Sequence, residues 1–391
     1  GASSALAVQT SASSVNSILV QRFGDDIQVI DQAVTDPVNR ILRQQPLSTM
    51  DSLKLVGAAN IADQVTVDLG AGGDFSIPEG MIFDGGAGTG DALTIVGTSN
   101  ADSFAVRKQA SDTEVPDHIV ANGLNVGFLG AEQLMLTGGA GGDTYKIAAL
   151  AVPTTLTDGV GGDTIDFSES TVVGVTIDLN KSAGAAQSVF GVKGGKTLAL
   201  KGLFADVIGT SKADKIKGNK LANHIWGGAG NDIIYGGGGA DWLYGEAGND
   251  KLYGGAGNTV LVGGNGNDRL ESTSGRALLI GGLGRDTLKG GRGDTILIGG
   301  TTTYDSNDLA LAAIMNEWTS AKPFNQRVNN LTKGIALGEE TIALNRKNAV
   351  NRNGSVVNDN ARDTLFGGAG HDWFFDFASD LVKNRNRRND R

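Results

Sequence analysis

The chain contains no cysteine, and it has only three histidines and six prolines among its 391 residues. Without cysteine there is no disulfide to stabilise the fold, and no cysteine and histidine cluster exists for a soft metal. No apolar run approaches the roughly 20 residues that a membrane-spanning helix needs. The 33 basic residues are outnumbered by 43 acidic ones, and the net charge of −10 argues against a nucleic-acid partner.

Glycine, in contrast, is in excess, with 60 of the 391 residues against roughly 7% in ordinary proteins. Between Gly209 and Gly300 it recurs with a period of nine residues, in the pattern G-G-x-G-x-D-x-U-x, where U is a large aliphatic residue. Residues 227–235 and 263–271 are two full copies. A flexible glycine-rich linker would not keep this phase, so the period indicates an ordered structure.

The first six positions of the repeat predict a tight turn, with glycine where φ is positive or where backbones crowd. The last three positions predict a short strand whose middle side chain points inward. We expect two repeats per coil, so that residues eighteen apart stack at roughly 4.8 Å. The inward positions are all Ile or Leu: Ile216, Ile225, Ile234, Leu243, Leu252, Leu261, Leu270, Leu279, Leu288 and Leu297.

This stacking places the sixth turn positions on two separate edges of the predicted coil. On one edge they are all aspartate: Asp214, Asp232, Asp250, Asp268 and Asp286. On the other edge only one carboxylate remains, in the series Asn223, Asp241, Thr259, Ala277 and Thr295. Carboxylates about 5 Å apart repel each other by roughly 3 kcal/mol at an effective dielectric near 20. We therefore expect cations mainly along the aspartate edge.

Calcium fits such an edge, because it takes six to eight oxygens, which carboxylates and turn carbonyls can supply. We predict several Ca²⁺ ions, each shared between successive coils, so that filling one site orders the next.

With this nonapeptide the chain resembles the RTX family of secreted calcium-binding proteins, whose repeats wind into a parallel β-roll. The Gly-x-x-x-Ala-Asp turns also look like those of large planctomycete surface proteins. The resemblance implies calcium binding by the turns. The predicted metal residues are Asp214, Asp232, Asp241, Asp250, Asp268, Asp286, Asp363 and Asp372, with Gly227, Gly228, Gly230, Gly245, Gly263, Gly264, Gly281 and Gly282.

Weaker copies of the turn precede the repeats, for example at Gly138 to Asp143. The chain is therefore expected to be all-β, a parallel β-roll or β-solenoid with a small helical insertion. The expected parts are an N-terminal segment (1–56) with a capping helix at Val38 to Gln45 after Asp36 and Pro37, a degenerate parallel solenoid (57–208), the RTX β-roll (209–300), the insertion (301–357), and final repeats with a C-terminal tail (358–391).

One outward face of the predicted roll is almost wholly apolar, and a patch of this size needs a cover. The insertion offers one. Its run Asp305 to Asp308 can cap a helix with Leu311, Ile314, Met315 and Trp318 on one face, followed by a helix with Phe324, Val328 and Leu331 that ends at Gly334. The alternative is self-association through this sheet, or a cell-surface or matrix partner.

The sequence shows little sign of catalysis. The stretch from Asp163 to Asn180 resembles the segment that leads into the β-roll of serralysin-type metalloproteases, but no H-E-x-x-H is present, since His118, His224 and His371 are far apart. We expect a secreted, extracellular or cell-surface protein with a non-catalytic structural role. The alternative is the calcium-binding portion of a secreted polysaccharide-active or proteolytic enzyme, with a groove of paired carboxylates within residues 60–200.

Overall fold

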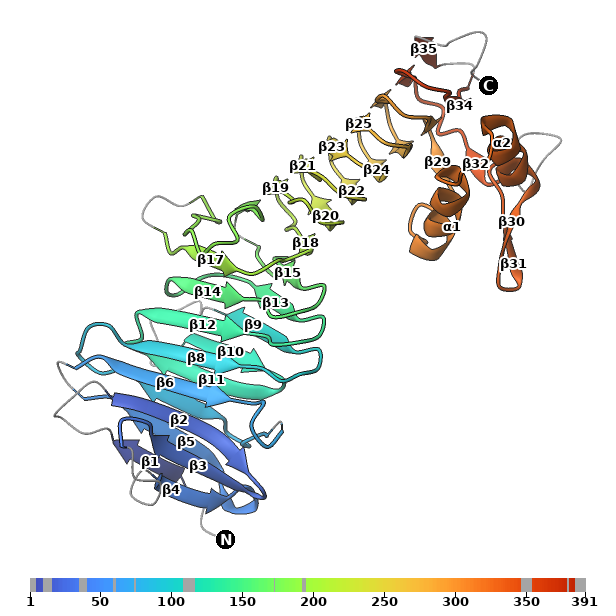
Figure 1. The fold of residues 1–391 in the computed structure, drawn as a ribbon. Coiled ribbons are helices and arrows are strands. Elements are labelled where there is room, and N and C mark those ends of the chain that lie inside the picture. Colours follow the sequence, from blue (N-terminus) through green and yellow to red (C-terminus); the bar gives the residue numbers. More distant parts are fainter. Residues whose placement is uncertain are drawn as a thin grey trace. The chain divides into compact units, whose positions relative to one another are not determined.

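The computed structural model describes residues 5–9, 16–34, 41–58, 61–73, 75–107, 117–171, 173–191, 195–345, 354–377 and 380–383 (Figure 1). The chain divides into two compact units. Unit 1 contains residues Gly1–Ser170 and Lys181–Asp206, and unit 2 contains Thr171–Asn180 and Val207–Arg391. Neither α-helix of the described residues has the length and hydropathy that crossing a membrane requires.

Two sheets build unit 1. In spatial order, the first contains β1 (Ala5–Gln9), β5 (Ser52–Val56), β7 (Met81–Asp84), β11 (Leu124–Leu129), β10 (Asp117–Ala121), β9 (Ser103–Arg107), β13 (Thr144–Ile147) and β15 (Thr164–Asp166). The second contains β17 (Leu198–Lys201), β14 (Thr154–Thr157), β12 (Gln133–Thr137), β8 (Ala92–Val96), β6 (Asp63–Asp68), β2 (Asn16–Phe23), β3 (Asp26–Asp31) and β4 (Ile41–Pro46). A short 3₁₀ helix, η1 (Leu47–Thr49), follows β4.

Most neighbouring strands of unit 1 are parallel, as in β6, β8, β12, β14 and β17. Alternate side chains of these strands, such as Val65, Leu93, Leu134 and Leu156, are at most 1% exposed and form the interior. Two antiparallel sections interrupt this order. In the first, β3 pairs with β2 and β4, and in the second, β10 pairs with β9 and β11. The prediction of an all-β fold built on parallel sheets is confirmed.

The predicted capping helix from Val38 to Gln45 is wrong where the structure describes it. Ile41–Pro46 is strand β4, which pairs antiparallel with β3, and Gln28 donates a 3.0 Å hydrogen bond to Gln44. The edge of β3 offers this segment a row of backbone partners, whereas an isolated eight-residue helix is unstable in water. Asp36 and Pro37 lie outside the described residues.

Unit 2 contains the roll, again with two parallel sheets. The first contains β18 (Asp206–Ile208), β20 (His224–Ala229), β22 (Trp242–Ala247), β24 (Thr259–Asn265), β26 (Ala277–Leu283), β28 (Thr295–Ile298) and β34 (Trp373–Phe375). The second contains β16 (Thr176–Asp178), β19 (Lys215–Lys217), β21 (Ile233–Tyr235), β23 (Lys251–Ala256), β25 (Arg269–Ser274), β27 (Thr287–Lys289), β33 (Thr364–Phe366) and β35 (Leu381–Lys383).

Residues eighteen apart pair in both sheets of the roll, as Leu243 does with Leu261 and Leu252 with Leu270. All ten predicted inward side chains, from Ile216 to Leu297, are fully buried. The register continues across the insertion, because Leu288 pairs with Leu365 and Leu297 with Phe374. The last repeats therefore complete the same roll.

The insertion between β28 and β33 contains β29 (Thr301–Thr302), α1 (Asp308–Trp318), α2 (Phe324–Lys333), β30 (Ile335–Leu337), β31 (Glu340–Ile342) and β32 (Val356–Val357). Asn307, inside the predicted capping run, is the N-cap of α1 and accepts a hydrogen bond from Ala310. Gly334, with a φ of 106°, is the C-cap of α2, as predicted.

The insertion covers the apolar sheet of the roll. Leu311, Ile314 and Trp318 of α1 and Val328 and Leu331 of α2 form one buried cluster with the outward side chains of that sheet, among them Val260, Val262, Leu278, Ile280, Ile296, Ile298, Trp373 and Phe375. The chain's own helices therefore occupy the surface that the sequence also left open to a second copy or a partner.

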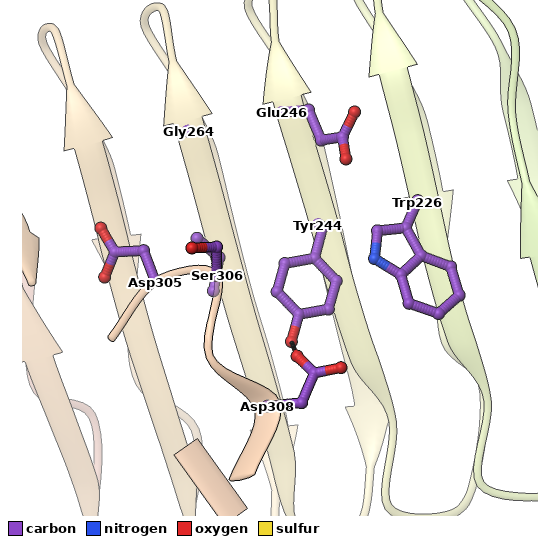
Figure 2. Close-up of a pocket in the computed structure, with 8 residues that line it drawn as sticks. Trp226, Tyr244, Glu246, Gly264, Asp305, Ser306 and Asp308 are labelled. Carbon is purple, nitrogen blue, oxygen red and sulfur yellow. Dashed lines mark hydrogen bonds between the residues drawn. The ribbon is translucent and has the colours of Figure 1, made fainter. Parts of the chain in front are cut away.

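A small cavity remains where the start of α1 meets the sheet, with a volume of about 290 Å³. Figure 2 shows the rings of Trp226 and Tyr244 beside each other on neighbouring strands, with Asp308 below Tyr244. The Tyr244 hydroxyl donates a 2.6 Å hydrogen bond to Asp308. Glu246, also in the lining, has a φ of 70° at the second repeat position, where glycine is usual. The cavity lies outside residues 60–200 and is near the lower limit for small-molecule sites, roughly 300 Å³.

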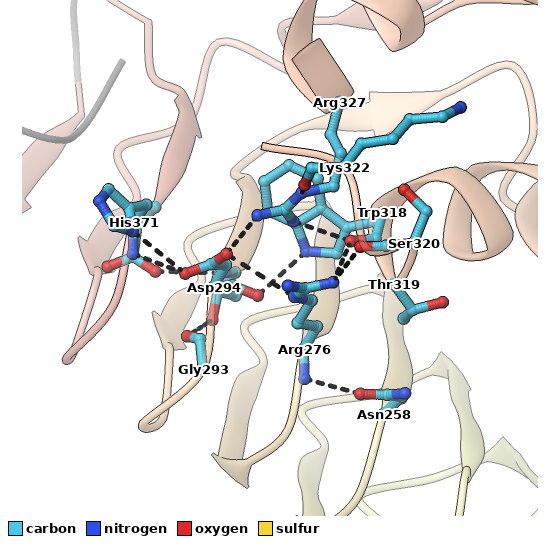
Figure 3. A network of polar contacts seen from close by, with 12 residues as sticks. Asn258, Arg276, Gly293, Asp294, Trp318, Thr319, Ser320, Lys322, Arg327 and His371 are labelled. Carbon is cyan, nitrogen blue, oxygen red and sulfur yellow. Dashed lines mark hydrogen bonds and ion pairs between the residues drawn. The ribbon is translucent and has the colours of Figure 1, made fainter. Parts of the chain in front are cut away.

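A buried ion pair attaches the insertion to the roll (Figure 3). Arg327 of α2 is 2% exposed, donates hydrogen bonds to Asp294 and to the carbonyl of Trp318, and lies over the Trp318 ring. Asp294 also accepts a 2.8 Å hydrogen bond from the backbone N–H of His371. Burial alone would raise the pKa of Asp294, but the His371 N–H and Arg327 outweigh it and lower this pKa.

We predict that Asp294→Asn destabilises the protein by about 3 kcal/mol or more, because the Arg327 guanidinium then stays buried without its counter-charge. The measurement is urea unfolding followed by the fluorescence of the four tryptophans, Trp318 among them. The control is Glu271→Gln, whose partner Arg269 has a side chain 51% exposed. Equal midpoints for the two variants would contradict this role of Asp294.

Candidate metal centre

The aspartate edge of the roll is a continuous hydrogen-bonded column. The backbone N–H of Asp232 donates to Oδ1 of Asp250 at 2.7 Å, and Asp250 donates in the same way to Asp268 at 2.8 Å. The same bond joins Asp268 to Asp286 and Asp286 to Asp363, so Asp363 extends the column across the insertion, as predicted. All these side chains are at most 2% exposed.

The second carboxylate oxygen of each column member lacks a hydrogen bond. Oδ2 is buried without a hydrogen-bond partner among the described residues in Asp232, Asp250, Asp268, Asp286 and Asp363. A buried polar atom without a partner typically costs about 1–3 kcal/mol, and more when it is charged. A recurrent, aligned series of such atoms therefore fits a row of binding sites for cations.

The glycine at the first repeat position makes room for this oxygen. A Cβ at Gly245 would lie 2.4 Å from Oδ2 of Asp250 and 2.5 Å from the carbonyl oxygen of Gly263 in the next coil. Gly227, Gly263 and Gly281 have the same close approach to the aspartate of their own turn. The turn therefore brings a carboxylate oxygen and a backbone carbonyl oxygen of the next coil to the same place.

The other predicted glycines are required by backbone conformation. Gly228, Gly264 and Gly282 have φ values of 99°, 103° and 107°, and Gly230 has a φ of 119°. A Cβ at any of the first three would lie 2.0–2.1 Å from the carbonyl oxygen of the preceding coil. These glycines let the turns stack closely enough for one ion to contact two coils.

This donor set fits calcium. It offers carboxylate and carbonyl oxygens, and among the described residues no group of three or more His, Cys, Asp or Glu side chains could hold a metal by itself. Backbone carbonyls must therefore complete the ligand shell, which is ordinary for Ca²⁺. A bound ion would neutralise neighbouring carboxylates and hold two successive turns together.

Electrostatics in the calcium-free protein oppose ionisation of the column. Burial, with added repulsion from neighbouring carboxylates, raises the pKa of Asp232 and of Asp286 to about 8. Burial likewise raises the pKa of Asp268 to about 7 and that of Asp250 and of Asp363 to about 6. In each case the backbone hydrogen bond to Oδ1 offsets only part of the effect.

Asp214, at the start of the column, differs from the other predicted ligands. Its Oδ2 accepts a 2.6 Å hydrogen bond from the N–H of Thr210, and its Oδ1 accepts bonds from the Thr210 hydroxyl and the N–H of Val175. The protein itself thus satisfies both oxygens. Asp380 is a further member that the sequence prediction missed, since it accepts a 3.1 Å bond from Asp363 at the far end.

In its series Asn223, Asp241, Thr259, Ala277, Thr295 and Asp372, the second edge has aspartate at two positions. Asp241 accepts a 3.0 Å hydrogen bond from Asn223, its Oδ2 has no partner among the described residues, and burial raises its pKa to about 7. Asp372 occupies the same edge after the insertion and accepts a 3.0 Å bond from Thr295. Asp241 therefore has the geometry of a column member but lacks acidic neighbours.

The comparison with protein families agrees with this geometry. The pattern of the RTX calcium-binding nonapeptide repeat matches residues 208–243, 226–261, 235–270, 271–301 and 359–380. These repeats bind Ca²⁺, and several copies imply several ions. A search of the curated proteins finds no match to the chain.

We predict that Asp250→Asn raises the calcium concentration at the folding midpoint by at least about tenfold, since it removes one charge between two sites of the column. Asp241→Asn, the matched change on the interrupted edge, should shift this midpoint by less than about threefold. The measurement is a calcium titration followed by far-ultraviolet circular dichroism. Equal shifts for both variants would overturn the prediction that calcium binds mainly along one column.

The raised pKa values predict how stability depends on pH without calcium. The folded state binds more protons than the unfolded state between the unfolded pKa of about 3.9 and the folded values of about 6 to 8. The free energy of unfolding should therefore fall as pH rises through this window. Because protons and calcium compete for the carboxylates, calcium affinity should rise over the same window. Urea unfolding of calcium-free protein at pH 5 and pH 8 measures the first effect, and greater stability at pH 8 would contradict it.

Proposed function

We propose that this chain, with its RTX calcium-binding nonapeptide repeats, is a secreted, non-catalytic structural protein of the cell surface or extracellular matrix whose roll becomes rigid when it binds calcium. The supporting observation is the aligned series of buried Oδ2 atoms without a hydrogen-bond partner in the described part of the roll. Every coil from Asp232 to Asp363 carries the same requirement for a cation, so calcium would stabilise the length of the roll rather than one local site.

Secretion follows from the calcium concentration that such a roll needs. Extracellular calcium modules have dissociation constants of roughly 10⁻⁴ to 10⁻³ M, far above cytosolic calcium levels. The unbound column carries buried carboxylates that oppose folding at neutral pH. The protein would therefore remain loosely folded inside the cell and become stable outside, where calcium is abundant.

A structural role is favoured because the conspicuous residues of the repeats already have structural tasks. The aspartates lie in the stacked turns, the aliphatic residues fill the interior, and the apolar sheet packs under the insertion. Three carboxylates line the cavity. Asp308 accepts a hydrogen bond from the Tyr244 hydroxyl, Asp305 accepts hydrogen bonds from Thr302, and Glu246 stands at a turn position of the repeat.

Contacts with other molecules would then use the surface that the insertion leaves accessible. Trp226 and Trp242 are only partly buried at the margin of the apolar cluster, and His224 packs against both rings. On the opposite sheet, Tyr235 is 36% exposed and stacks on Tyr253. These aromatic side chains are the candidate contact points for a second copy or a matrix partner.

A calcium titration at fixed ionic strength tests the proposal, with circular dichroism and sedimentation measured on the same samples. We expect a cooperative increase in β signal that EDTA reverses, because filling each site orders the next coil. An increase in mass over the same range would support an assembling structural protein. A chain that is fully folded in EDTA and does not respond to calcium would contradict the proposal.

A further inference from the structure

A second column of stacked aspartates lies in unit 1, outside the nonapeptide repeats. The backbone N–H of Asp102 donates to Oδ1 of Asp143 at 2.9 Å, and that of Asp143 donates to Oδ1 of Asp163 at 2.9 Å. This is the bond that joins the aspartates of the roll. The sequence spacing does not reveal it, because these residues are separated by 41 and 20 positions instead of 18.

The two columns begin in the same way. Asp102 follows the turn Gly97 to Ala101, and its carboxylate accepts hydrogen bonds from the N–H and the hydroxyl of Thr98. Asp214, at the start of the roll, is satisfied by the N–H and hydroxyl of Thr210. A threonine thus hydrogen-bonds to the first aspartate of each column. The next aspartate in each column is the first whose Oδ2 lacks a hydrogen-bond partner among the described residues.

The next two turns of unit 1 stack like those of the roll. Gly141, at the fourth position of its turn, donates a 2.8 Å hydrogen bond to the carbonyl of Val160. The N–H of Val160 donates a 3.0 Å hydrogen bond to the carbonyl of Gly139. In the roll, Gly230 donates to Ala247 at 2.7 Å, and Ala229 to Thr210 at 3.2 Å, from the corresponding positions. The backbone of residues 138–163 therefore offers the same arrangement of turn carbonyls.

These two turns contain three carboxylate oxygens that are buried without a hydrogen-bond partner among the described residues. Asp143 and Asp163 are fully buried, and their Oδ2 atoms have no hydrogen-bond partner among the described residues. The same holds for Oδ1 of Asp158, whose other oxygen accepts a 2.8 Å bond from Leu203. Asp158 stands at the first position of its turn, where the repeats have glycine, and its carboxyl contacts that of Asp163.

We propose that the turns Gly138 to Asp143 and Asp158 to Asp163 form a calcium site of unit 1, held by the carboxylates of Asp143, Asp158 and Asp163 together with turn carbonyls. The site differs from those of the repeats because Asp158 adds a carboxylate where the repeats have none. Oxygen-only ligands and three negative charges suit a hard divalent cation. The inference does not depend on the structural role proposed above, since it concerns ion binding by the other unit.

Hydrogen–deuterium exchange of the full chain, with peptides resolved by mass spectrometry, tests this site locally. At calcium 100 times above the dissociation constant, exchange in residues 138–166 should slow by roughly 100-fold if it requires release of the ion. Asp163→Asn should abolish this protection and lower calcium bound in equilibrium dialysis by one ion per chain. The matched control, Asp232→Asn, should weaken protection in residues 227–270 and leave residues 138–166 unchanged.

Asp158→Asn is the second test variant, because its amide oxygen can still accept the bond from Leu203, and it should give the same loss as Asp163→Asn. The proposal is overturned if residues 138–166 of the unaltered protein exchange at the same rate with and without calcium. It is also overturned if both variants keep full protection and stoichiometry, which would mean that calcium binds without the carboxylates of Asp158 and Asp163.

Discussion

The contact between the aspartate at the end of each turn and the glycine at its start controls the architecture of the roll. The carboxylate folds back into its own turn, and its Oδ2 takes the space that a Cβ of that glycine would fill. Oδ1 accepts the backbone N–H of the preceding coil, so one side chain closes a turn and joins two coils. The cost is a buried carboxylate oxygen without a hydrogen-bond partner in the coils from Asp232 to Asp363, and a bound calcium ion would remove that cost.

In one turn of the roll, an aspartate one position earlier than usual binds the insertion. Asp294 stands one position before Thr295, which occupies the usual aspartate position. Its carboxylate bonds to Arg327 of α2 and to the backbone of His371. Because of this one-position shift, Asp294 anchors the helices that cover the apolar sheet. Trp318 strengthens the anchor by donating a 3.0 Å hydrogen bond to the carbonyl of Asp294.

Calcium thus has different consequences in different parts of the molecule. In the roll it would neutralise the regular column of aspartates that lies in the calcium-binding nonapeptide repeats. In unit 1 the proposed ion would lie between two turns of unequal spacing, with Asp158 as an added ligand. Both arrangements bury carboxylate oxygens without a hydrogen-bond partner among the described residues, so a bound cation would couple folding to the calcium concentration of the surroundings.

The nine-residue period alone determined the roll, its inward Ile and Leu side chains and the aspartate column, because a strict repeat carries its own register. The apolar faces of α1 and α2 were likewise readable from helical spacing, as Trp318 and Val328 show. Only the tertiary structure decided that Ile41–Pro46 extends along β3, that Asp143 stacks on Asp163, and that Asp294, in a turn of the interrupted edge, pairs with Arg327. In these places loops of irregular length bring distant residues together, and the pairing depends on which backbone or charge each one meets in space.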